Sequence, residues 1–380
     1  MSHRVSGMPE LTTLGAGALV AVAIGLWFCR DRLLPKFLRS QDVTLVDKIL
    51  NVLLPLFVPS SQIPKKPSKL FAFRKAFVSW PALKPYHDFV CKGTVATISV
   101  PRRDGTGDVE VLMHSPPPLG DGPMENSMEL IVYYHGGGFT AGSAQDAYGA
   151  STVAALTRAS GRLFVWASVE YRLAPEHAHP AAAHDCIDAA RHLLTSAACA
   201  ARFGYDRDRV HLFGISAGGN LALVTAAALV RSPPPGAPSV ASLCCDQPFV
   251  CATCNTPSYA ENDDFRIAPT AWLRWCWRVY LKQGGEASAA ELRAALDDPL
   301  CCPHTAAGAL AGRVAFPPTL VLTALGDPLR DEGRACLAAL RTAGAWVDHL
   351  EMRASHGVGC EILSGARAVA VAKWAALMYR

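Results

Sequence analysis

The stretch VHLFGISAGG, residues 210–219, decides the fold. A short apolar run typical of a buried strand leads directly into a Gly-x-Ser-x-Gly motif centred on Ser216, and Ala-rich helical sequence follows. A serine on such a sharp strand-to-helix turn needs glycine neighbours, because larger side chains would clash with the strained backbone. The helix that begins behind Ser216 favours the negative charge that develops on an attacking oxygen. The stretch therefore predicts a nucleophilic serine at the end of a strand.

Outward from this stretch, short β-rich segments alternate with Ala-rich helical segments. This alternation predicts an α/β fold, a mostly parallel central sheet flanked by helices. Ligands bind at the carboxyl ends of the strands in such sheets, and each motif described below falls at such an end. We expect strands at residues 130–135, 163–171, 210–214, 319–325 and 346–352, and helices at residues 147–159, 180–201, 220–230 and 330–343.

A second motif, HGGGF, begins at residue 135 and follows the predicted strand at 130–135. Consecutive glycines allow backbone N–H groups to approach a substrate oxygen and converge on one point. A phosphate-binding loop is the alternative, but no Lys and Ser/Thr follow at the required spacing. We predict an oxyanion hole made by Gly136, Gly137 and Gly138 together with the N–H of Ala217. We expect His135 to shape this loop and not to act as the base.

A base and its orienting carboxylate are expected after the serine, in the chain order Ser, Asp, His. Asp327 directly follows the strand at 319–325, whereas Asp331 lies a turn into the next helix and is expected to point elsewhere. His356 follows the last predicted strand, whereas His349 lies inside it and is expected to be structural. We predict that His356 takes the proton of Ser216 and that Asp327 holds the imidazole tautomer.

Taken together, these motifs resemble the hormone-sensitive-lipase-like family of α/β-hydrolases, which includes bacterial esterases and arylacetamide deacetylase. HGGGF at 135, YRLAPEH at 171–177, GISAGG at 214, DPLRDEG at 327–333 and HG at 356 stand in that family's order, from about residue 129 to the carboxyl terminus. The resemblance implies an α/β-hydrolase fold with a helical cap, and a serine carboxylic ester hydrolase acting through an acyl-enzyme on short- to medium-chain or lipophilic esters.

The same resemblance implies that the cap comes from the region before Val95 and from residues 258–281. Three tryptophans in the second segment either line an acyl or alcohol pocket or form the cap core. For substrate contacts we predict Phe139, Ile215 and Trp272. Many members of the family carry Asp where this chain has Ile215, and Phe where it has Val358. The three tryptophans of the cap segment 258–281 are Trp272, Trp275 and Trp277.

Two other functions use similar sequences. Plant gibberellin receptors resemble this family but lack the catalytic histidine, so the presence of His356 argues against a non-catalytic small-molecule receptor. An amide or acetyl-amine hydrolase would share every catalytic group, so only substrate competition separates it from an esterase.

Composition narrows the possible ligands. The chain has 36 Lys and Arg against 32 Asp and Glu, a formal charge of +4. No basic run with interleaved aromatic residues occurs, so we expect no nucleic-acid partner and a substrate of little charge. Hydrophobic residues make up 51% of the chain and charged residues 18%, which supports a large packed core. Oligomeric state stays open.

The 13 cysteines are scattered along the chain, which favours a reducing compartment over a disulfide framework. Cysteines 244–245 and 301–302 are adjacent pairs, a geometry unsuited to bridging. Cys251 and Cys254 form a CxxC, but no second CxxC or His pair accompanies it as in common zinc sites. We therefore expect no metal and no organic cofactor.

The amino terminus contains an uncharged apolar run from Leu11 to Cys29, about the length that crosses a bilayer as a helix. It ends in bulky aromatics followed by Arg30, which favours a retained single-pass anchor over a cleaved signal peptide or a core helix. More basic residues follow the run than precede it, so the positive-inside rule favours a cytosolic catalytic domain. We expect a membrane protein of the endoplasmic reticulum, divided into an anchor and flank (1–40), an amino-terminal cap or linker (41–94) and the hydrolase domain (95–380), with a cap insertion near 255–300.

Overall fold

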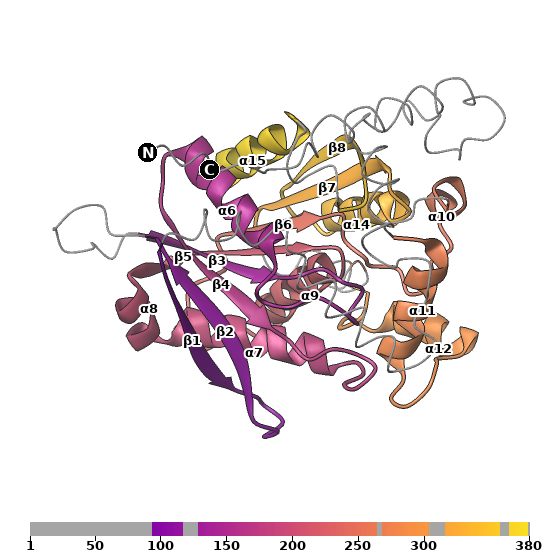
Figure 1. The fold of residues 1–380 in the computed structure, drawn as a ribbon, viewed down its shortest axis with the longest axis horizontal. Helices are drawn as coiled ribbons and strands as arrows, with labels where there is room; N and C mark the ends of the chain where they lie inside the picture. Colours follow the sequence, from indigo (N-terminus) through magenta and orange to yellow (C-terminus); the bar gives the residue numbers. More distant parts are fainter. Residues whose placement is uncertain are drawn as a thin grey trace, which may run out of the picture.

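The computed structural model describes residues 93–116, 128–263, 268–302, 304, 316–357 and 365–378. Within these residues one eight-stranded sheet has the strand order β1-β2-β4-β3-β5-β6-β7-β8 (Figure 1). The strands are β1 (Thr94–Pro101), β2 (Asp108–Ser115), β3 (Met128–Tyr134), β4 (Phe164–Glu170), β5 (Tyr205–Ile215), β6 (Ser242–Asp246), β7 (Thr319–Gly326) and β8 (Val347–Ser355).

The direction of the strands determines where the motifs meet. Strand β2 is antiparallel to both of its neighbours, β1 and β4, whereas β3 to β8 pair in parallel. The carboxyl ends of β5, β6, β7 and β8 therefore lie at one edge of the sheet, side by side. This edge carries Ser216, Asp327 and His356, which directly follow β5, β7 and β8.

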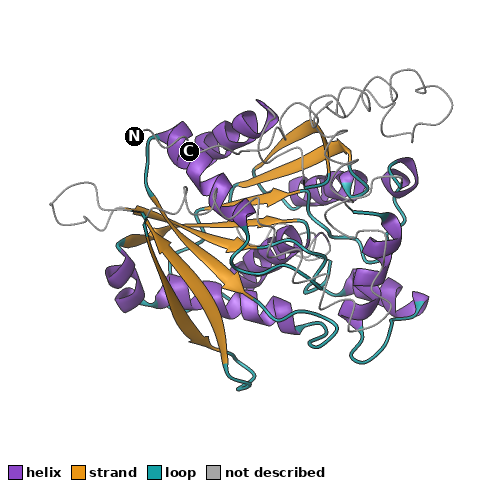
Figure 2. Ribbon diagram, viewed as in Figure 1, coloured by secondary structure: helices purple, strands orange, loops and turns teal. Residues whose placement is uncertain are grey.

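Helices cover both faces of the sheet (Figure 2). Helices α6 and α15 pack on one face, while α7, α9 and α14 pack on the other. Helices α10, α11 and α12 lie beyond the carboxyl ends of the strands, where the cap insertion is predicted. The helices are α6 (Ala147–Ser160), α7 (Ala181–Thr195), α8 (Ala197–Phe203), α9 (Ala217–Arg231), α10 (Pro257–Glu261), α11 (Thr270–Leu281), α12 (Ala289–Ala294), the 3-10 turn η1 (Ala295–Asp297), α14 (Arg330–Thr342) and α15 (Gly365–Met378).

Strand β3 shows how the core is divided by the sheet. Every residue of this strand is buried, as expected for a parallel strand covered on both faces. Leu130 and Val132 belong to the apolar cluster on the α7–α9 face, and Ile131 and Tyr133 to the cluster on the α6–α15 face. The period-two alternation of a strand thus contributes to two cores, one on each face of the sheet.

Each predicted strand is present, and the predicted helix at 180–201 is wrong in one respect. It divides at Ser196 into α7 and α8, because the Ser196 hydroxyl accepts a hydrogen bond from the Cys199 N–H (3.1 Å) and so begins a new helix. Sequence patterns missed β1, β2, β6 and α15, whereas α10, α11 and α12 lie in the region of the predicted cap insertion. Strand β6 is only 5 residues long and contains a Cys pair, which explains why no strand was predicted there.

Other predictions concern residues that the structure leaves undescribed. The predicted anchor at 11–29 and nearly all of the segment 41–94 lie outside the described residues, as does Val358. In the described part of the chain, no helix has the length and apolar character needed to cross a membrane. All ten cysteines in that part are free thiols, so the adjacent pairs do not bridge there.

Candidate active site

Ser216 occupies a strained turn between β5 and α9. Its backbone has φ 57° and ψ −120°, a left-handed conformation that residues with a side chain rarely adopt. The flanking glycines are sterically required: a β-carbon at Gly214 would lie 2.0 Å from the carbonyl oxygen of Gly218, and one at Gly218 would lie 1.9 Å from that of Tyr134. The tight packing of α9 against β5 and β3 therefore presents the Ser216 hydroxyl at the sheet edge.

The three predicted groups lie in hydrogen-bond contact. His356 Nε2 is 3.0 Å from Ser216 Oγ, and His356 Nδ1 is 2.9 Å from Asp327 Oδ2. All three residues are buried. With Nδ1–H donating to the carboxylate, Nε2 is left to accept the Ser216 proton. His349 lies instead within β8, where its Nε2 is 2.9 Å from Thr323 Oγ1, in agreement with a structural role.

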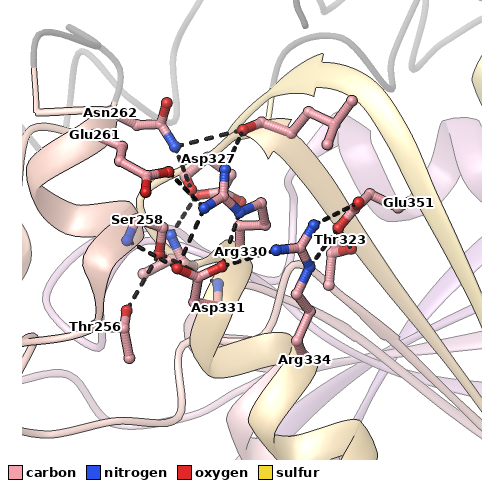
Figure 3. A network of polar contacts seen from close by, with 12 residues as sticks. Thr256, Ser258, Glu261, Asn262, Thr323, Asp327, Arg330, Asp331, Arg334 and Glu351 are labelled. Carbon is pink, nitrogen blue, oxygen red and sulfur yellow. Dashed lines mark hydrogen bonds and ion pairs between the residues drawn. The ribbon is translucent and has the colours of Figure 1, made fainter.

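The turn that carries Asp327 is braced from two sides (Figure 3). Its second carboxylate oxygen, Oδ1, accepts a hydrogen bond from the Leu329 N–H (2.8 Å). From helix α10, Ser258 Oγ donates to the Pro328 carbonyl (2.6 Å) and Asn262 Nδ2 donates to the Asp327 carbonyl (3.1 Å). The cap helix therefore holds the backbone that positions the carboxylate.

Asp331, the other candidate carboxylate, faces Ser258, Arg330 and Arg334 (Figure 3). Its oxygens accept hydrogen bonds from the Ser258 N–H (2.9 Å), from Arg330 Nε (2.8 Å) and from Arg334 Nη1 (3.1 Å). The structure thus gives the two aspartates of the DPLRDEG motif different surroundings: Asp327 faces His356, and Asp331 joins α14 to α10.

The glycine loop after β3 adopts backbone conformations that favour glycine. Gly137 has φ 122° and Gly138 has φ 61°. A β-carbon at Gly137 would lie 2.2 Å from the Ala141 carbonyl oxygen. The Gly137 carbonyl in turn accepts hydrogen bonds from the N–H groups of Thr140 (3.1 Å) and Ala141 (3.0 Å), which close the loop.

This loop lies against the serine turn. A β-carbon at Gly136 would be 3.5 Å from the β-carbon of Ser216. No hydrogen bond between described residues uses the N–H groups of Gly137, Gly138 or Ala217. Ala217 is the first residue of α9, where an N–H has no partner within the helix. Gly136 and Ala217 thus lie next to Ser216, and the assignment of the loop N–H groups as oxyanion donors stays a prediction.

His135 is packed beneath the loop. Its ring stacks on Tyr171 with centroids 4.1 Å apart, and its Nδ1 is 2.8 Å from the Gly136 carbonyl. The Tyr171 hydroxyl donates to the His135 carbonyl (2.7 Å). Burial lowers the pKa of His135 to about 4, so the ring is neutral near pH 7. These contacts agree with a loop-shaping role, and they give Tyr171 of the YRLAPEH motif a position that sequence reasoning did not assign.

The predicted substrate contacts divide into two groups. The Phe139 ring is fully buried and stacks on Tyr280 at 4.0 Å, which places it in the core and argues against substrate contact. Trp277 is likewise fully buried and belongs to the cap core.

The second group lies next to the glycine loop. Trp272 is only partly buried, and its Cη2 would lie 3.1 Å from a β-carbon at Gly138. Ile215 lies beside Gly136, 3.4 Å from a β-carbon there. Trp272 and Ile215 are therefore the two predicted side chains next to the glycine loop.

Gln247, which sequence reasoning missed, holds both sides of the histidine turn. It follows β6, with φ 47°. Its Oε1 accepts a hydrogen bond from the Gly357 N–H (2.7 Å), and its Nε2 donates to the Ser355 carbonyl (3.3 Å). Its own N–H donates to the Leu322 carbonyl of β7 (2.9 Å). One amide side chain thus brackets His356, and because β6 is not predicted from sequence, no sequence signal indicates this role.

Replacing Gln247 with alanine is expected to lower kcat/KM by about 10- to 100-fold, because a displacement of the base of about 1 Å costs up to about 10² in rate. We expect the loss in kcat, with KM changed little, since the side-chain amide bonds to the two residues that flank His356. Steady-state kinetics beside Gln145→Ala, a change at an exposed glutamine, measures it. An equal loss in both variants, or none in Gln247→Ala, would contradict the positioning role.

The charge around His356 favours its protonated form. Burial alone lowers the pKa of His356, but the charge of Asp327, the hydrogen bond to it and the charge of Asp246 together raise the pKa above the usual 6.5. Asp246 ends β6, and its carbonyl accepts the Ser216 N–H (2.9 Å). The dipeptide 246–247 therefore contacts both the serine turn and the histidine turn.

A pH profile follows from this shift. A base must be neutral, so kcat/KM is expected to rise with pH through an apparent pKa above 6.5 and to fall below it as His356 becomes protonated. Asp246→Asn removes one of the charges that raise this pKa, so its profile is expected to shift to lower pH. Initial rates on a neutral ester across pH 5 to 9 measure both, and an unshifted profile would contradict the contribution of Asp246.

One hollow on the described surface lies away from this site. It has a volume of about 570 Å³ and is lined by residues at the start of β5, including Tyr205 and Asp206. Strand β5 runs from Tyr205 to Ile215, so this hollow and Ser216 lie at opposite ends of a strand roughly 30 Å long. It is not part of the candidate active site.

Known proteins are similar to this chain in sequence and in fold. The model of the alpha/beta hydrolase fold family matches residues 131–358. The chain is 34% identical over 244 residues to the carboxylesterase NlhH of Mycobacterium tuberculosis, covering 63% of this chain and 67% of that protein. It is 30% identical over 264 residues to an ethyl acetate hydrolase of Pseudomonas putida, covering 67% and 71%. A hyperthermophilic esterase from the archaeon Pyrobaculum calidifontis superposes with a TM-score of 0.69 and 28% identity, covering 88% of this chain and 97% of that one.

Proposed function

This chain belongs to the hormone-sensitive-lipase-like family of α/β-hydrolases, and we propose that it hydrolyses carboxylic esters through an acyl-enzyme formed on Ser216. The enzyme class, carboxylic ester hydrolase, follows from the family together with relatives that are named carboxylesterase and esterase. The observation that carries the serine mechanism is the unbroken set of hydrogen bonds from Asp327 through His356 to Ser216.

In the proposed reaction, Ser216 Oγ attacks the acyl carbon while His356 Nε2 takes its proton. The tetrahedral oxyanion accepts hydrogen bonds from the loop N–H groups and from Ala217, and each such donor is worth about 10²–10³ in kcat. The intermediate collapses, His356 returns the proton to the leaving alkoxide, and the alcohol departs. Water then attacks the acyl-enzyme with His356 as base, the carboxylic acid leaves, and Ser216 recovers its proton.

We propose short- to medium-chain or lipophilic esters as substrates. Trp272 is only partly buried beside the glycine loop, and its apolar ring suits an uncharged acyl or alcohol group. The relative named ethyl acetate hydrolase carries a small ester in its name. Ile215 stands where many family members carry a carboxylate, so no acidic side chain adjoins the serine at this position.

The test uses the purified full chain with p-nitrophenyl esters of increasing acyl length, together with a fluorophosphonate probe and matched anilides. We expect ester turnover that falls beyond medium chain lengths, probe labelling at Ser216, and slower cleavage of the anilides. Folded protein that neither labels nor turns over would overturn the esterase proposal in favour of a non-catalytic receptor. Faster cleavage of the anilides than of the esters would instead assign an amide hydrolase.

We further propose that residues 11–29 anchor the protein in the membrane of the endoplasmic reticulum, with the catalytic domain on the cytosolic side. Support comes from the uncharged apolar run and the basic residues that follow it. The full chain is expected to stay in the membrane pellet after alkaline carbonate extraction, with its catalytic domain open to added protease in sealed microsomes. Release by carbonate would contradict the anchor, and protection from protease would contradict the orientation.

A further inference from the structure

A second cluster of chemically reactive side chains lies at the base of the cap. His179 precedes α7, Asp298 follows η1, and Cys301 lies three residues beyond it. The His179 ring nitrogen, an Asp298 carboxylate oxygen and Cys301 Sγ all lie within 4.8 Å of one another. His179 and Cys301 are far apart in the sequence, so no spacing pattern indicates that they meet.

We propose that His179, Asp298 and Cys301 bind a divalent zinc ion. Zinc accepts one nitrogen, one oxygen and one sulfur ligand at about 2.0–2.3 Å in tetrahedral geometry, which sets its ligands roughly 3.5 Å apart. His179 Nε2 and Asp298 Oδ2 are 2.9 Å apart, so small movements of side chains would admit the ion. Magnesium and calcium prefer all-oxygen ligands, and the thiol disfavours them.

The ligands are held by their surroundings as metal ligands usually are. The other ring nitrogen of His179, Nδ1, is 3.3 Å from the Tyr280 hydroxyl, which orients the ring and leaves Nε2 toward the site. Asp298 Oδ1 accepts the Leu300 N–H (2.8 Å), which leaves Oδ2 toward the histidine. The Cys301 carbonyl accepts a hydrogen bond from Asn220 Nδ2 (2.7 Å).

Burial divides the site into a closed side and an open side. The Cys301 side chain is fully buried, and its Sγ has no hydrogen-bond partner within the described part of the chain. The His179 and Asp298 side chains are 12% and 39% exposed. A zinc ion can therefore enter from solvent and keep one water as its fourth ligand, while Cys301 gives up its proton to become a thiolate.

The position of the site indicates a structural role. The His179 N–H also donates to the Tyr280 carbonyl at the end of α11 (2.6 Å). The ion would thus join the start of α7, on the sheet, to the segment that follows α12 and η1. Asn220, one turn into α9 from Ser216, bonds to this same segment. Zinc would therefore stabilise the packing of the segment 298–301 on α9, the helix that follows Ser216.

The test uses the full chain freed of metal with EDTA and titrated with zinc chloride by calorimetry, with thermal unfolding followed in parallel. We expect one zinc per chain and a higher unfolding temperature with zinc than with EDTA. Cobalt(II) in place of zinc is expected to give a thiolate-to-metal charge-transfer band. Cys301→Ser and, independently, Asp298→Asn are expected to weaken binding at least tenfold, and Cys301→Ser to remove the band. Cys251→Ser, in the CxxC, is the matched thiol control.

Absence of binding in the full chain would overturn the proposal, as would binding that survives Cys301→Ser and is lost in Cys251→Ser. Circular dichroism of each variant without metal separates lost binding from lost folding. If Cys301→Ser fails to fold, Asp298→Asn decides: unweakened zinc binding in that variant overturns the site. These measurements do not depend on ester hydrolysis, so they test the zinc site independently of the proposed enzyme mechanism.

Discussion

Ser216→Ala is expected to lower kcat by at least about 10⁴-fold, because loss of the nucleophile removes the entire covalent route and leaves only binding and the oxyanion donors. Fluorophosphonate labelling should vanish with the activity. Alanine carries a β-carbon like serine, so the strained φ of 57° is kept. The variant loses one buried hydrogen bond to His356, worth about 1 kcal/mol. The fold should therefore survive.

Rates on the best p-nitrophenyl ester, with active-site titration, provide the measurement. The matched control is Ser239→Ala, which changes an exposed serine in the loop before β6 and should retain full activity. Substantial turnover by Ser216→Ala, with a folded protein and a single labelled residue elsewhere, would show that another group is the nucleophile.

Asp327→Asn is expected to lower kcat by about 10⁴-fold, the size of effect seen when an orienting aspartate is replaced by its amide. An amide NH₂ donates to His356 Nδ1 and so places the ring proton on Nε2, where it faces Ser216 and prevents base catalysis. The neutral amide also fails to stabilise the imidazolium. KM should change little, since Asp327 is fully buried beneath the histidine and does not face substrate.

The variant Asp331→Asn is the matched control, because it changes a neighbouring aspartate that supports the fold and does not contact the histidine. Asp331 bonds to Arg330, Arg334 and the Ser258 N–H and not to the histidine. We therefore expect a less than tenfold change in kcat and a lower unfolding temperature. Should Asp331→Asn abolish turnover while Asp327→Asn stays active, the assignment of the orienting carboxylate would be wrong.

The residues with strong local signals could be predicted from sequence alone. Ser216, Asp327 and His356 each directly follow a strand with a clear apolar pattern, and parallel strands bring such ends to one edge. The tight conformation of the glycine loop could also be predicted, because consecutive glycines allow the close approach of backbone that Gly137 shows with its φ of 122°. Strand-end positions therefore predicted the three residues that the structure places in hydrogen-bond contact.

What could not be predicted depends on contacts between distant segments. Gln247 follows a strand of 5 residues with no periodic signal, and its role appears only because β6 lies between β5 and β7. Phe139 is predicted as a substrate contact, yet its fully buried ring stacks on Tyr280 of α11. The burial of this ring depends on how α11 packs against the glycine loop, and the local sequence pattern does not determine that packing.

The bracing of the Asp327 turn by α10 has a consequence for engineering new specificity. Exchanging the cap of this enzyme for that of a relative would replace Ser258 and Asn262, whose side chains bond to the Pro328 and Asp327 carbonyls. A chimaera designed only to reshape the substrate pocket would thus disturb the acid–base dyad as well. Grafts that begin after Asn262 would retain the native α10 and its bonds to the Asp327 turn. We expect such grafts to change selectivity without slowing turnover.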